Sequence, residues 1–314
     1  MQFDDDAPLD PSQVEDVRAG GSQPRGGGPM PGGCMLPIGG RGGGCLLLVL
    51  AVAGLFLFGL IPSPFTGTEG GRQGGGQLPS APPAPSPSGN LAERCRTGAD
   101  ADQSEDCRVV GIVNSIQSYW RQAFAERGQG TYTPARTVLF SQAVSTGCGI
   151  ADSAVGPFYC PADRKVYLDL TFFNTLQRDF GAAGGPFAQA YVIAHEYGHH
   201  VQNLLGTMEK IGASRPGATG TSVRLELQAD CYAGVWAHNA VKTGFYQEPF
   251  TQDDINQALS AAAAVGDDTI QRRTRGRVTP DAFTHGTSEQ REKWFGTGYD
   301  SGDAQRCDTF SGGI

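Results

Sequence analysis

The sequence predicts an α+β fold that is mostly helical and contains a small β-sheet. Glycine and proline are concentrated in the first 90 residues, one uncharged apolar run interrupts them, and regular apolar periodicity begins only afterwards. These three observations divide the chain into four expected parts: a disordered tail (1–44), one transmembrane helix (45–61), a flexible linker rich in proline, glycine and serine (62–90), and a folded domain (91–314).

The tail and the linker contain stretches such as "GGSQPRGGGPMPGG" and "SAPPAPSPSGN". Such segments bury too little apolar surface to offset the backbone entropy lost on folding, so we expect both to be disordered. The remaining residues are enough for one domain. The formal net charge of −8 argues against a nucleic-acid partner, because binding phosphate requires a basic surface.

The apolar run "CLLLVLAVAGLFLFGLI" has 17 residues and no charge, which is at the short end for a membrane-crossing helix. A cleaved signal peptide is the alternative, but the preceding 44 residues are too long for an n-region and no A-x-A site follows closely. We therefore expect a single-pass membrane protein. Arg18, Arg25 and Arg41 precede the run and only Arg72 follows nearby, which favours a cytoplasmic N-terminus and an extracytoplasmic domain.

The cysteines support an oxidising compartment. Two of the eight, Cys34 and Cys45, lie beside or inside the apolar run, and the other six allow fifteen pairings. A cysteine metal site is the alternative, but no C-x-x-C occurs. Two pairs lie twelve residues apart, so we expect local bonds for these and a third bond tying back the C-terminus: Cys95–Cys107, Cys148–Cys160 and Cys231–Cys307.

The first elements of the domain combine one helix with short strands. Apolar residues at helical spacing predict a helix over 109–124, and β-branched and aromatic runs predict strands over 137–144 and 165–170. The segment between the strands reads as a long loop stapled by its two cysteines. Residue Thr171 is a plausible N-cap for a short helix that follows.

Four longer helices are expected in the rest of the chain. The first spans 187–206, between "GGP" and a glycine, and the second spans 222–241. The third and fourth, 251–265 and 287–299, each open with a capping-box pattern, Thr251 with Asp254 and Thr287 with Gln290.

The helix over 187–206 contains "HEYGH", an H-E-x-x-H motif. Residues four apart lie on one face of a helix, so His195 and His199 can each offer a ring nitrogen to one metal ion. Glu196 would project beside the metal, where it can take a proton from an attacking water and pass it to a leaving amine. The spacing thus matches metal-assisted hydrolysis with one Zn²⁺; a surface helix with stacked histidines is the alternative.

A catalytic zinc needs a third protein ligand, and "ELQAD" about thirty residues downstream offers one. We expect Glu226 to be that ligand and Asp230, one turn later, to accept a hydrogen bond from a ligand histidine. The roles of these two carboxylates could be exchanged. A solvated acidic face is the other interpretation, although the apolar neighbours indicate a buried helix.

Three histidines remain. His200 points about 100° away from His199 around the helix, so we expect it and His238 to serve packing or surface roles. His285, in "DAFTHGTSEQR", precedes a helix in a polar stretch. It is a candidate catalytic residue that could stabilise the oxyanion of a tetrahedral intermediate, with a structural role equally open.

With these residues in place, the chain resembles the neutral zinc metallopeptidase family of bacterial membrane-anchored proteins. The resemblance spans about residues 94–310 and rests on "AHEYGHHVQ", "LELQADCYAGVWA", "GPFYCPADRKVYLDL" and "FTHGTSEQREKWFGTGYDSGDAQRCDTF". It implies that residues 91–314 form a zincin-like metallopeptidase domain, with the active-site helix beside a small sheet whose edge strand aligns a peptide. It also implies a gluzincin pattern in which Glu226 is the third ligand.

Two functions of different classes follow from these residues. The first is a membrane-anchored zinc endopeptidase that acts on a peptide or protein, with "KVYLDL" as the strand that pairs with substrate. The second is a metal-stabilised cell-surface scaffold or binding protein without turnover, against which the presence of Glu196 argues, since a purely structural site has no use for a base. Hydrolysis of a non-peptide amide is a third possibility.

Overall fold

The computed structural model describes residues 1–18, 90–211 and 215–314, and these form a mostly helical α+β fold, as expected from the sequence. The predicted transmembrane helix (45–61) and nearly all of the predicted linker lie outside the described residues. In the described part of the chain, no helix combines the length and apolar character needed to cross a membrane.

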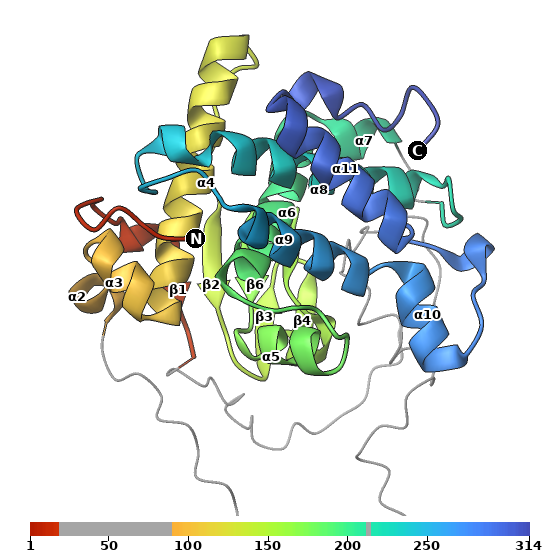
Figure 1. Ribbon diagram of the computed structural model, residues 1–314, viewed down its shortest axis with the longest axis horizontal. Helices are drawn as coiled ribbons and strands as arrows, with labels where there is room; N and C mark the ends of the chain where they lie inside the picture. Colours follow the sequence, from red (N-terminus) through yellow and green to blue (C-terminus); the bar gives the residue numbers. More distant parts are fainter. Residues whose placement is uncertain (19–89, 212–214) are drawn as a thin grey trace, which may run out of the picture.

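A four-stranded mixed sheet has the strand order β1-β2-β6-β5. Strands β1 (Val14–Asp16), β2 (Arg136–Leu139) and β6 (Lys165–Leu168) run parallel, and β5 (Phe158–Cys160) pairs antiparallel with β6 as the outer strand. The register aligns Val14 with Thr137, and Tyr159 with Val166. The α6 helix lies beside this sheet (Figure 1).

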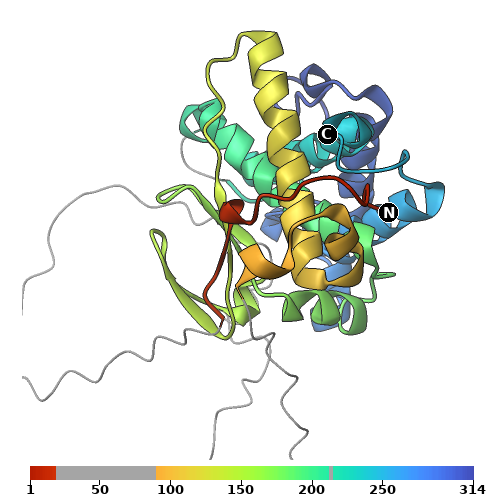
Figure 2. The same cartoon turned by 90° about the vertical axis from the view of Figure 1, so that its left-hand side faces the viewer.

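The prediction of a disordered tail is wrong for residues 1–18. This segment runs across α4 and then adds β1 to the sheet (Figure 2). Phe3 is fully buried against Tyr246, and a Cβ on Gly111 would lie 2.5 Å from the Phe3 ring. The side chain of Asn114 both donates to and accepts from the Asp10 backbone. These few apolar residues are too sparse to show helical or strand periodicity, so only their binding partners elsewhere in the chain order them.

The prediction of a long loop before β6 is also wrong. Strands β3 (Ala143–Thr146) and β4 (Gly149–Asp152) form an antiparallel hairpin, and β5 follows. Strands of three or four residues with polar members give little alternation to detect. The next helix, α5 (Thr171–Arg178), begins at Thr171, so Thr171 is its first residue and not the predicted N-cap. The side chain of Asp169 accepts a hydrogen bond from the Thr171 backbone N–H.

The expected long helices are present. Their observed bounds are α4 Glu105–Arg127, α6 Pro186–Leu204, α8 Thr221–Asn239, α9 Gln252–Ala264 and α11 Ser288–Ser301. Both predicted capping boxes are confirmed, at Thr251 and Thr287. Shorter helices that the sequence did not indicate are α2 Leu91–Arg94, α3 Gly98–Gln103, α7 Thr207–Ile211 and α10 Asp267–Arg275.

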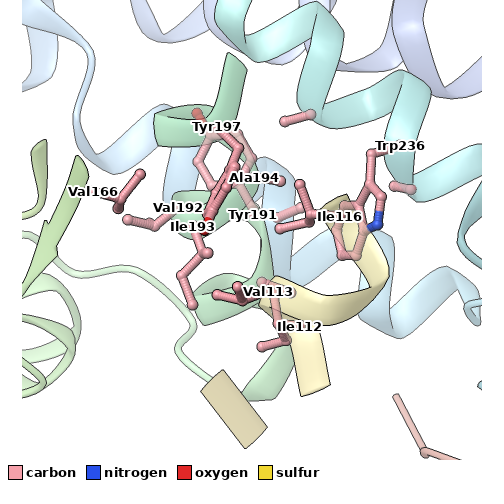
Figure 3. Packing of buried hydrophobic residues seen from close by; sticks show 14 of the residues in the cluster. Ile112, Val113, Ile116, Val166, Tyr191, Val192, Ile193, Ala194, Tyr197 and Trp236 are labelled. Carbon is pink, nitrogen blue, oxygen red and sulfur yellow. The ribbon is translucent and has the colours of Figure 1, made fainter. Parts of the chain in front are cut away.

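The main core gathers around α6. Ile112, Val113 and Ile116 of α4 lie beside apolar side chains of α6, and Val166 of β6 lies on the sheet side (Figure 3). The cysteine pairing is confirmed: Cys95–Cys107, Cys148–Cys160 and Cys231–Cys307 are bonded. The second bond ties the β3–β4 hairpin to β5, and the third ties the C-terminal segment to α8.

Candidate metal centre

His195 and His199 lie one turn apart on α6, and both are buried, with 1% and 2% of their surface exposed. Glu226 of α8 faces both imidazoles. Its Oε2 lies 3.1 Å from Nε2 of His195, and its Oε1 lies 3.4 Å from Nε2 of His199. The three residues predicted to bind metal therefore lie together in the folded chain, although Glu226 comes 27 positions after His199 in the sequence.

Close contact between α6 and α8 brings this carboxylate to the histidines. Gly198 lies at the contact, where an added Cβ would lie 2.9 Å from both the Cα and the carbonyl oxygen of Ala229. Real Cβ atoms essentially never come so close to backbone atoms. A glycine in the variable part of H-E-x-x-H therefore allows the second helix to reach the metal face of the first.

The cluster fits a zinc ion by donor type and by spacing. One ligand atom from each of His195, His199 and Glu226 lies within 4.8 Å of the other two. Tetrahedral zinc with bonds of about 2.0–2.2 Å separates its ligand atoms by about 3.4 Å, close to the two distances observed. Burial opposes ionisation of Glu226, but the nearby His199 and His285 outweigh it and hold the pKa of that carboxyl well below its usual range.

Asp230 lies behind His195, one helical turn after Glu226. Its Oδ1 is 2.7 Å from Nδ1 of His195 and accepts a hydrogen bond from the Tyr191 hydroxyl at 2.6 Å. Arg291 of α11 donates to both oxygens of the same carboxylate. Burial opposes ionisation of Asp230, but Arg291 and His195 outweigh it and lower its pKa. A hydrogen bond from Nδ1–H leaves Nε2 of His195 free for a metal.

Glu196 is 1% exposed, and within the described residues its Oε1 has no hydrogen-bond partner. Burial raises the pKa of this carboxyl, while the nearby His195 and His199 and a hydrogen bond from the Tyr159 backbone act in the opposite direction. Desolvation makes a carboxylate a stronger base. Glu196 therefore has the basicity and the free oxygen that accepting a proton requires.

His285 lies just before α11 and is 6% exposed. Asp267 holds its loop by accepting hydrogen bonds from three consecutive backbone N–H groups, those of Thr284, His285 and Gly286, at 2.6–3.0 Å. Burial lowers the pKa of His285, but Glu226 and Asp267 outweigh it and raise the pKa. The structure thus brings His285 close enough to Glu226 for their charges to interact.

The other two histidines lie outside the cluster. His200 is fully buried, with Nδ1 3.0 Å from the Tyr159 hydroxyl and Nε2 2.7 Å from the Thr133 carbonyl oxygen. His238 is on the exposed side of α8, 2.6 Å from the Tyr299 carbonyl oxygen.

Several contributors were not found from the sequence: Tyr191, Gln202, Asp267 and Arg291. Gln202 accepts at 2.9 Å from His199 and donates to the Leu225 carbonyl, so its position three residues after His199 was an available signal. Tyr191 lies one helical turn before His195, which was a comparable signal, whereas Asp267 and Arg291 come from distant segments.

The fold and the cluster define a class: a mostly helical α+β protein with an H-E-x-x-H candidate metal centre whose third ligand comes from the next long helix. The chain belongs to the family described as "Putative neutral zinc metallopeptidase", whose family model matches residues 8–310. The match begins inside the N-terminal segment that carries β1.

Relatives are found in distant bacteria. The "Uncharacterized protein Rv2575" of Mycobacterium tuberculosis is 54% identical over 224 residues, which cover 69% of this chain and 75% of the relative. The "Uncharacterized protein YpfJ" of Escherichia coli K12 is 40% identical over 307 residues, 96% of each chain. No solved structure matches the chain.

Proposed function

We propose that the chain is a zinc-dependent endopeptidase that hydrolyses peptide bonds, with one zinc ion held by His195, His199 and Glu226. The observation that carries the proposal is Glu196, which follows the first ligand, is buried, and keeps one carboxylate oxygen unpaired among the described residues. A site that only holds a structural metal has no use for such a base.

The chemistry divides between the ion and the protein. When bound, zinc acts as a Lewis acid that polarises a carbonyl group and makes water acidic near neutral pH. Glu196 accepts the proton of the water that attacks the peptide carbonyl, and then delivers it to the leaving amine nitrogen. His285, held by the Asp267 loop, donates toward the oxygen that becomes negatively charged.

The outer strand β5 is the better candidate for aligning an extended peptide. The expectation that "KVYLDL" pairs with substrate is wrong: its first four residues form β6, and β2 and β5 occupy both edges of that strand. Within the described residues, strand β5 pairs only with β6, and its Tyr159 backbone is hydrogen-bonded to Glu196. A substrate strand added there would bring its carbonyl groups toward the catalytic base. With a substrate strand in place, this arrangement would be the zincin-like one that the family resemblance implies.

We also propose that the domain works outside the cytoplasm. Three disulfide bonds in one domain support an oxidising compartment. The substrate would then be an extracytoplasmic peptide or protein.

Metal analysis of the purified protein, followed by identification of cut sites with and without chelator, tests the proposal. One zinc per chain and chelator-sensitive cleavage are expected. Glu196→Gln keeps the shape of the side chain but not its basicity, so it should retain zinc and lose at least about 10²-fold in kcat. If the variant and the wild type both bind zinc and neither cleaves, the metal-stabilised scaffold is the better description.

A further inference from the structure

The guanidinium of Arg291 is buried next to the candidate metal centre without contacting any of its three metal ligand atoms. It is 1% exposed, and its Nε and Nη2 donate to Oδ2 and Oδ1 of Asp230 at 2.8 and 2.9 Å. Nη2 also lies 3.2 Å from the Tyr191 hydroxyl and 3.3 Å from Nδ1 of His195. Among the described residues, the third nitrogen, Nη1, has no partner. The hydrogen bonds of this side chain thus converge on Asp230 and Tyr191.

Because Asp230 is buried, its negative charge must be compensated by a nearby cation. An isolated carboxylate with no exposed surface is strongly disfavoured, and removing one partner from a buried ion pair leaves an uncompensated charge. The two-pronged contact also fixes the plane of the carboxylate, because the guanidinium presents two N–H groups in a rigid fork. Arg291 therefore sets both the charge and the orientation of Asp230.

The orientation of Asp230 in turn sets that of His195. Oδ1 accepts from Arg291, Tyr191 and His195 at once, so the imidazole is held at a fixed angle with Nε2 toward Glu226. Groups that hold a ligand histidine in this way typically change metal affinity by 10–100-fold when removed.

The close contact of α8 and α11 makes this arrangement possible. A Cβ on Gly234 would lie 2.1 Å from the Phe295 carbonyl oxygen, and one on Gly298 would lie 2.0 Å from the Cys231 carbonyl oxygen. Two glycines, Gly234 four residues after Asp230 and Gly298 seven residues after Arg291, thus let the two backbones meet near the Asp230–Arg291 pair. The Cys231–Cys307 bond fixes α8 to the chain that follows α11.

We infer that Arg291 is a positioning residue of the metal centre, which acts through Asp230 to present His195 to the ion. The inference rests on the proposed zinc site. It predicts that Arg291 affects zinc affinity without contacting zinc or substrate.

The test measures zinc dissociation constants by chelator competition for the wild type, Arg291→Met, Arg291→Lys, Asp230→Asn and the double variant Asp230→Asn/Arg291→Met. Arg291→Met is expected to weaken zinc binding by at least tenfold. The double variant should bind zinc no more weakly than Asp230→Asn alone, because Nδ1 of His195 donates its proton to Asp230 and so cannot accept one from Arg291. Arg291→Lys keeps the charge but not the fork, so its loss should be intermediate.

Arg18→Met is the matched control. Arg18 makes the same fork with Asp16, by Nε at 2.8 Å and Nη2 at 2.6 Å, but lies outside the cluster. Its removal should leave the zinc dissociation constant within about twofold of the wild-type value, whatever its effect on folding stability.

The absorption spectrum of the cobalt-substituted protein provides a second measurement, because a change in folding stability alone does not alter the spectrum of the bound metal. We expect a changed spectrum for folded Arg291→Lys and an unchanged spectrum for Arg18→Met. Wild-type zinc affinity and spectrum in both Arg291 variants would overturn the inference while leaving the proposed function intact. If Arg291→Met does not fold, Arg291→Lys decides by the same criteria. A wild-type protein that binds no zinc would instead refute the proposed function itself.

Discussion

Gly198 and Ala229 touch where the helix of the H-E-x-x-H motif crosses the helix that carries Glu226. An added Cβ on Gly198 would lie 2.9 Å from two backbone atoms of Ala229 and 3.1 Å from its Cβ. The contact sets the distance between the two histidines and the third ligand. The short spacing of the metal centre is therefore a property of helix packing as much as of the ligands.

Gly198→Ala should accordingly weaken the site. The methyl group must push α8 away, which costs about 1–3 kcal/mol of folding stability and moves Glu226 from the histidines. We expect at least a tenfold loss of zinc affinity, measured by chelator competition. Gly296→Ala in α11 is the control, because nothing lies within 4 Å of a Cβ there, and it should leave zinc binding unchanged. Equal zinc constants for the two variants would contradict this account.

His285→Phe should reduce catalysis and spare the metal. If His285 stabilises the developing oxyanion, its loss lowers kcat by about 10²–10³-fold, while zinc content stays at one per chain. His238→Phe replaces an exposed histidine and should leave kcat within about twofold. A loss of zinc together with activity would instead assign His285 a structural role.

His200 should make the fold sensitive to mild acid. Burial lowers its pKa to about 4, outweighing the hydrogen bond to the Thr133 carbonyl. Between its pKa of about 6.5 in the unfolded chain and about 4 in the folded protein, only the unfolded chain binds the proton, so stability falls as pH falls. From pH 7 to pH 5 the loss from this group is about 2 kcal/mol.

Urea unfolding at both pH values, with chelator present throughout, measures this loss. His200→Gln should show a smaller decrease in unfolding free energy on acidification than the wild type. His238→Gln should behave like the wild type. The same decrease in all three proteins would show that His200 is not the group responsible.

The docking of residues 1–18 predicts their position relative to any membrane. Because β1 pairs with β2 of the domain, we expect both on the same side, whereas the single membrane crossing by residues 45–61 expected from the sequence would place them on opposite sides. The test places single cysteines at exposed Ser12 and Ser301, with Cys34 and Cys45 replaced by serine. An impermeant thiol reagent applied to intact cells should label both positions or neither. Labelling of one alone would refute the prediction.

The local parts of the site could be predicted from the sequence because they depend on helical geometry alone. His195 and His199 share a face through the spacing of one turn, and Thr251 and Thr287 cap their helices through contacts three residues away. The cysteine pairs twelve residues apart were equally local. Glu226 was found because the carboxylates of "ELQAD" repeat at helical spacing on an otherwise apolar helix.

The remaining features depend on contacts between distant segments, so only the tertiary structure decided them. Arg291 lies 61 residues from the Asp230 that it holds, and β1 lies more than 100 residues from the strand that it joins. No local sequence pattern identifies the partner of Val14 or the partner of Arg291. Their roles arise because buried charge requires compensation and a short strand requires a neighbour, and the partner that meets each need is set by how the whole chain packs.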